Sequence, residues 1–141
     1  MAVAVKRVYE AVSRSDGTRV LVDRLWPRGL TKEVAAVKFW LRDLAPSNEL
    51  RQWFHAHPEA WSQFRRQYFK ELASPDASAA LEKLHRLAET AARVTLLYAS
   101  RNETRNNATV LKEFLEGARK PPSSVGRAAV GGERIRKAKR Q

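Results

Sequence analysis

Between Arg19 and Gly29 the chain reads RVLVDRLWPRG, and this stretch decides the fold. Three consecutive apolar residues, 20–22, are typical of a strand that is covered on both faces, as in a parallel sheet. Pro27 lacks the amide hydrogen that a central strand needs, so the strand ends before it. The strand predicted over 19–25 therefore stops among acidic, basic and aromatic side chains, where α/β proteins commonly form a site.

Apolar periodicity predicts further strands and helices on either side of this stretch. Residues 3–9 and 93–99 favour strands, whereas 37–41 suit either extended chain or helix. Helical spacing and capping residues predict, in chain order, a helical turn over 31–35, helices beginning at Asn48 and Pro58, a helix over 79–92, and a helix capped by Asn106 or Asn107 that stops near Gly117. This order predicts an α/β fold: a small, mainly parallel sheet of three to four strands flanked by about four helices, which cover both faces.

The positive charge of the chain is unevenly distributed. Of the net charge of +12 over 141 residues, +7 lies in residues 119–141, which contain eight basic residues and one acidic residue. Pro, Gly and Ser are frequent in that segment and apolar residues are sparse. We therefore expect a single α/β domain over 1–118 and a flexible basic C-terminal tail over 119–141.

Composition excludes several kinds of site. The absence of cysteine rules out disulfides, thiolate zinc sites, iron–sulfur clusters and a cysteine nucleophile. His55 and His57 are two residues apart and do not face each other on a helix, so no metal site is expected. The chain also lacks a glycine-rich phosphate loop, and no cofactor is expected. No apolar run reaches membrane length and no secretory signal begins the chain, which favours a cytoplasmic protein without a membrane partner.

Two predicted strands end in polar clusters that would meet in a parallel sheet. One cluster follows residue 22, and the other begins at Tyr98 and leads into the last helix. Parallel strands place both clusters at the same edge, beside the N-terminus of that helix, which attracts anions. Arginine adds fork-shaped donors for phosphate or carboxylate. The residues expected to bind such a ligand are Arg24, Trp26, Arg28, Tyr98, Ser100, Arg101 and Asn106.

Asp23 is the candidate catalytic residue of this crevice, as a base or as the partner that orients an arginine. The sequence leaves open whether a ligand is only bound or also transformed. It also leaves open a structural role, in which Asp23 pairs with Arg24 or caps a turn and Trp26 packs a loop against the core.

A nucleic-acid-associated, regulatory protein is the alternative function. Residues 119–141 would bind phosphates without sequence specificity, and Trp26 or Trp40 would offer a stacking surface. A domain that binds only a protein partner is a third interpretation.

The stretch 16–29, with its Asp-Arg-Leu-Trp-Pro-Arg-Gly string, resembles the signature of the YeaO-like proteins, a branch of the "domain of unknown function 488" family. Residues 6–9, 45–47 and 95–98 are similar to the same family in the same order, and the likeness covers roughly 3–116. The resemblance implies a small bacterial cytoplasmic α/β protein whose activity is not established.

Overall fold

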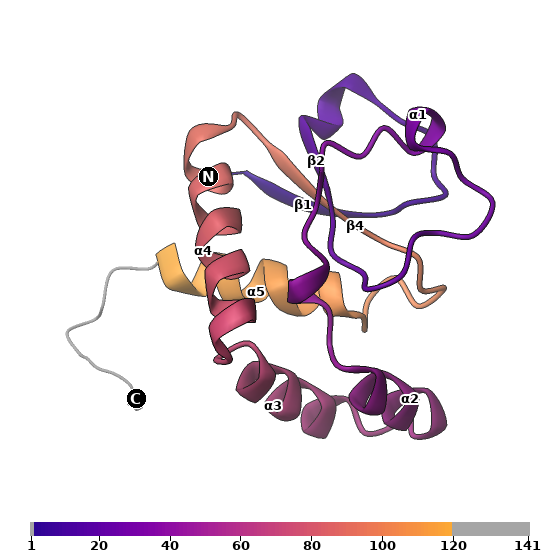
Figure 1. The fold of residues 1–141 in the computed structure, drawn as a ribbon, viewed down its shortest axis with the longest axis vertical. Helices are drawn as coiled ribbons and strands as arrows, with labels where there is room; N and C mark the ends of the chain where they lie inside the picture. Colours follow the sequence, from indigo (N-terminus) through magenta and orange to yellow (C-terminus); the bar gives the residue numbers. More distant parts are fainter. Residues whose placement is uncertain (1, 120–141) are drawn as a thin grey trace.

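The sheet is four-stranded and entirely parallel, as the apolar strands predict. The computed structural model describes residues 2–119, so the predicted basic tail lies outside the described residues from position 120 onward. The strands are β1 (Val3–Arg7), β2 (Thr18–Leu21), β3 (Phe39–Trp40) and β4 (Val94–Tyr98), in the spatial order β1-β4-β2-β3 (Figure 1). The two neighbours of β4, which are β1 and β2, both pair with it in parallel. The ends of these three strands therefore lie at the same edge of the sheet.

Within residues 2–119, seven helical segments accompany the strands, and most begin at a capping residue. They are the 3₁₀ turns η1 (Arg14–Asp16) and η2 (Arg42–Leu44), and the helices α1 (Lys32–Ala35), α2 (Asn48–Ala56), α3 (Trp61–Glu71), α4 (Pro75–Thr90) and α5 (Asn107–Arg119). The start predicted at Pro58 was wrong, because 57–60 form a turn before α3. The stop expected near Gly117 lies two residues before Arg119, the last residue of α5 within the described part of the chain.

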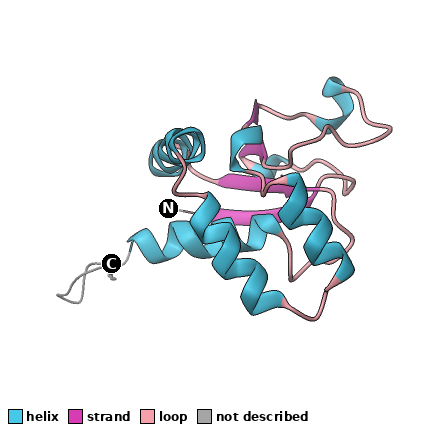
Figure 2. Ribbon diagram, turned by 60° about the horizontal axis from the view of Figure 1, so that its bottom comes forward, coloured by secondary structure: helices cyan, strands magenta, loops and turns pink. Residues whose placement is uncertain are grey.

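Helices α2–α5 cover one face of the sheet (Figures 1 and 2). The side chains of this face come from alternate strand positions such as Val20, Leu96 and Tyr98, which pack with apolar residues of the four helices in one core. Among residues 2–119, no helix is long and apolar enough to cross a membrane.

The second face of the sheet is covered mainly by a loop, where helices were expected. Val8, Leu21 and Leu97 form its small apolar centre with Ala35 of α1. Trp26 and four neighbouring apolar residues pack around that centre, and none of the cluster comes from α2–α5. Of the helices expected on both faces, only the short α1 lies on this one, and the rest of segment 22–38 provides the remaining cover.

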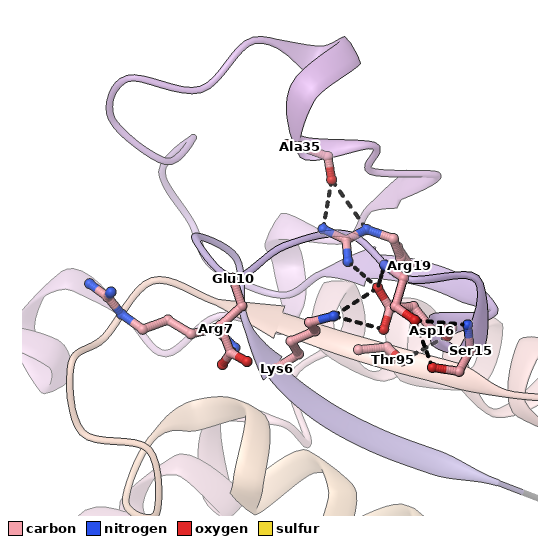
Figure 3. A network of polar contacts seen from close by, with 9 residues as sticks. Lys6, Arg7, Glu10, Ser15, Asp16, Arg19, Ala35 and Thr95 are labelled. Carbon is pink, nitrogen blue, oxygen red and sulfur yellow. Dashed lines mark hydrogen bonds and ion pairs between the residues drawn. The ribbon is translucent and has the colours of Figure 1, made fainter.

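A buried polar network fixes this loop to the sheet (Figure 3). The Arg19 side chain, 4% exposed, pairs with Asp16 at 2.6 Å and donates two further hydrogen bonds to the carbonyl of Ala35. Lys6 of β1 also bonds Asp16, and the Thr95 hydroxyl of β4 donates to the Asp16 carbonyl at 2.7 Å. The network thus joins β1, β2, β4 and α1.

Gly17 makes the turn into β2 feasible. Its φ is +64°, and a Cβ at this position would lie 2.3 Å from the backbone oxygen of Arg93. That oxygen accepts the hydrogen bond from Thr18 N at 2.9 Å, so it cannot move without loosening the start of the β2–β4 pairing.

Gly17→Ala is therefore expected to lower the free energy of unfolding by more than about 2 kcal/mol, measured by urea denaturation. Gly29→Ala is the matched control, because Gly29 has a φ of +84° but open space around it. Gly29→Ala should lower the free energy of unfolding by about 1 kcal/mol, from backbone conformation alone. If the two variants lost equal amounts of unfolding free energy, the clash expected between a Cβ at position 17 and the Arg93 oxygen would be contradicted.

Candidate functional site

The two polar clusters meet where β2 and β4 end. The amide of Ala99, just beyond β4, donates to Asp23 Oδ2 at 2.9 Å. The Asn107 side chain, at the first residue of α5, donates to Asp23 Oδ1 at 3.0 Å and to the carbonyl of Val22 at 2.9 Å. Asp23 therefore joins the ends of two strands and the start of a helix.

Both carboxylate oxygens of Asp23 accept hydrogen bonds, but none comes from a cation. Burial raises the pKa of Asp23 above 3.8, and the hydrogen bonds from Asn107 and Ala99 and the charge of Arg51 oppose that rise only in part. The Asp23 carbonyl also accepts the indole N–H of Trp40 at 2.7 Å. Asp23 is thus held in place through both its side chain and its backbone.

Tyr98 and Asn106 form the second group of predicted residues. Both are buried, and Asn106 Oδ1 accepts the amide of Thr109 at 3.0 Å, which caps α5. Burial raises the pKa of the Tyr98 hydroxyl, as do the charges of Glu103 and Glu10, whereas Arg7 and a hydrogen bond with Asn106 lower it. The N-terminus of α5 is therefore already occupied by the polar side chains of the protein itself.

Arg24 points away from Asp23 and does not pair with it. Its guanidinium is half-buried, and its Nη2 donates a long hydrogen bond, 3.4 Å, to the carbonyl of Ala45. Its Nε is buried and has no hydrogen-bond partner within the described part of the chain. In that part of the chain Arg24 also has no acidic partner within ion-pair distance.

The other predicted residues are less closely associated with this centre. Trp26 belongs to the loop face, where its N–H donates to Leu30 O at 2.6 Å and its ring meets that of Trp40 edge-on at 5.4 Å. Arg28 is exposed, and its carbonyl accepts the Tyr9 hydroxyl at 2.9 Å. Ser100 and Arg101 lie exposed in the loop before α5.

Sequence reasoning missed the role of Asn107. It was expected only as an alternative cap, but Asn106 caps α5 and Asn107 bonds the end of β2. The available signal was the pair of adjacent asparagines, since one of them is left over once the helix has its cap. Over residues 2–119, no group of three or more His, Asp or Glu side chains is placed to hold a metal ion.

The raised pKa of Asp23 gives a pH dependence of stability that can be measured. The folded protein takes up the Asp23 proton at a higher pH than the unfolded chain, so this contribution to the free energy of unfolding grows as pH falls through the raised pKa towards 3.8. Urea denaturation of wild type and Asp23→Asn should show their difference widening from neutral pH to about pH 4 in favour of wild type. Asp43→Asn, on the exposed η2 turn, is the control variant; a constant or shrinking difference for Asp23→Asn would contradict the assignment.

Comparison with known proteins supplies the family. A family profile described as the inactive DUF488-N3 subclade matches residues 2–127. The uncharacterised protein YeaO of Escherichia coli is 43% identical over 117 residues, which cover 82% of this chain and 97% of YeaO. An uncharacterised protein of Mycobacterium tuberculosis is 44% identical over 115 residues, which cover 82% of this chain and 94% of the relative. No solved structure matches the chain. The chain is therefore a YeaO-like member of the DUF488 family.

Proposed function

We propose that the protein binds a small ligand through a phosphate or carboxylate group at the edge of the sheet where the strands end, with Arg24 as the central contact. The observation that carries this proposal is the incompletely bonded guanidinium of Arg24. Leaving a buried donor without a hydrogen-bond partner costs about 1–3 kcal/mol of stability. The presence of such a donor at Arg24 therefore favours a partner that is bound from solution.

Arg19, the fully buried arginine of this stretch, has internal partners. Arg19 is bonded to Asp16 and Ala35. Arg24 has only a weak contact to a neutral carbonyl, and among residues 2–119 no acidic side chain lies within ion-pair distance of it. A guanidinium offers parallel N–H donors that match the oxygens of phosphate or carboxylate.

Exposed cationic and polar side chains lie on the loops at this edge. Arg28 follows β2, and Ser100 and Arg101 follow β4. In this proposal they attract and select the ligand from solvent, whereas Tyr98 and Asn106, which are buried, shape the floor. Trp26 supports the loop that carries Arg28.

Binding without catalysis is the form of the proposal that the observations favour. Each oxygen of Asp23 accepts a hydrogen bond from within the protein, one from Ala99 and the other from Asn107, so the carboxylate is engaged in holding the structure together. The matching subclade of the family is described as inactive. We therefore assign Asp23 the part of a positioning residue that fixes the edge from which Arg24 projects.

Arg24→Gln tests the proposal directly. Phosphate or acetate, added at constant ionic strength against chloride, is expected to raise the Tm of the wild type by about 4 °C for each kcal/mol of binding free energy gained. Arg24→Gln should lose that rise, because glutamine cannot supply the charged fork. The measurement is differential scanning fluorimetry, with each variant compared with its own anion-free baseline.

Arg66→Gln, an exposed change on α3, is the matched control and should keep the full rise in Tm. The proposal fails if no anion stabilises the wild type, or if Arg24→Gln responds as strongly as wild type does.

Nucleic-acid association is a second candidate function, which the charge of residues 119–141 favours. Eight of these residues are basic and one is acidic. Contacts of this kind are made to phosphates, so affinity should fall steeply as salt concentration rises.

Replacing tail cations with glutamine should abolish salt-sensitive binding of a duplex DNA oligonucleotide while leaving the anion response of Arg24 intact. The changes are Arg134→Gln, Arg136→Gln, Lys137→Gln, Lys139→Gln and Arg140→Gln. Electrophoretic mobility shifts across a salt series measure the effect. Retained DNA binding in this variant would contradict a role for the tail.

A further inference from the structure

The large apolar side chains that remain exposed are confined to one side of the domain. Among the described residues they are Tyr9, Val12, Leu25 and Val34, and the last two are 64% and 62% exposed. Leu25 and Val34 lie in segment 22–38, which covers the second face of the sheet, and Tyr9 and Val12 lie in the segment between β1 and η1. Helices α2–α5 contribute none, because their apolar side chains pack into the large core.

The excess positive charge of the folded domain has the same location. Residues 1–42 carry nine basic and four acidic residues, a net charge of +5, whereas residues 43–118 carry ten of each. Of the exposed charged side chains in residues 9–42, five are cations and two are anions. The cations are Arg14, Arg28, Lys32, Lys38 and Arg42.

We define the loop surface as the exposed side chains of segments 9–15 and 24–42. Its parts are fastened together from within. Tyr9 of the first segment bonds the carbonyl of Arg28 at 2.9 Å, and Trp26 bonds Leu30 at 2.6 Å. Arg19 holds the end of α1 through the Ala35 carbonyl (Figure 3). A surface held in this way loses little conformational entropy when a partner binds.

We propose that the loop surface is a docking site for an acidic protein segment that carries apolar side chains. Leu25 and Val34 give the partner apolar area to bury, and the surrounding arginines and lysines give it a complementary charge. A parallel sheet normally has a helical layer on each face, and a docked segment would complete the thin second layer.

A nucleic acid fits this surface less well. Its exposed apolar residues include three aliphatic side chains, which offer no stacking platform. The Trp40 ring is covered by Arg42, whose guanidinium carbon lies 4.2 Å from the ring centre, and it meets Trp26 edge-on. A second copy of the chain fits less well too, because two identical surfaces would oppose like charges.

The test uses the full chain and a fluorescein-labelled peptide of glutamates with interspersed leucines, with affinity read by fluorescence anisotropy. Leu25→Ser combined with Val34→Ser should weaken binding by about tenfold or more, because two exposed apolar anchors are lost. Arg28→Glu combined with Lys32→Glu should weaken binding by a similar factor, and more at low salt.

The matched control is Arg66→Glu combined with Lys70→Glu, the same charge change on exposed positions of α3, which should alter affinity by less than about twofold. Residues 119–141 are unchanged in every variant, so differences in affinity between variants report on the mutated surface. The proposal is overturned if the serine variant binds as well as wild type, or if a leucine-free peptide binds equally well. It is also overturned if a single-stranded oligonucleotide of equal length binds more tightly than the peptide and the serine variant leaves that affinity unchanged.

Discussion

The buried ion pair between Arg19 and Asp16 is the constraint on which the second face of the sheet depends. A charge that is 4% exposed is tolerated only with a partner, so Arg19 must find both Asp16 and the Ala35 carbonyl. Burial raises the pKa of Asp16, but the Ser13 amide, Lys6 and Arg19 outweigh it and lower the pKa overall. Asp16 therefore stays ionised at neutral pH, and the network fixes where α1 and its loop lie.

The two aspartates of the signature stretch have opposite surroundings. Asp16 is bonded to two cations, whereas Asp23 is bonded to an amide and an asparagine, and burial raises the pKa of Asp23. Arg24 follows Asp23 in sequence but projects towards Ala45, so the obvious ion pair is not made. The consequence is an edge with one shielded carboxylate and one under-bonded guanidinium, which is why Arg24 and not Asp23 is the ligand contact we propose.

Local sequence patterns predicted most of the sheet, because three apolar runs coincide with strands. Since these strands are parallel, their carboxyl ends lie at the same edge. Longer-range partners could not be predicted. Arg19 looks like a charged residue at a strand boundary, and only the path of segment 22–38 shows that it is buried. The second face has only the short α1 as a helix for a related reason: Lys6, Arg19 and Thr95 make part of this face polar, a pattern visible only once strand register is known.

The candidate site and the loop surface use the same excess of positive charge in different ways. At the end of the strands, Asp23, Asn106 and Asn107 already bond one another's elements at the helix terminus that would attract an anion, so the proposal places a small group on Arg24 instead. On the loop surface no internal acid competes for Arg28 or Lys32 within ion-pair distance among residues 2–119, and the same segments carry exposed apolar side chains. Dispersed charge with apolar anchors suits a partner that contacts many points weakly, whereas a single buried guanidinium suits one compact ligand. The two proposals can therefore succeed or fail separately, although both depend on the stretch that begins at Arg19.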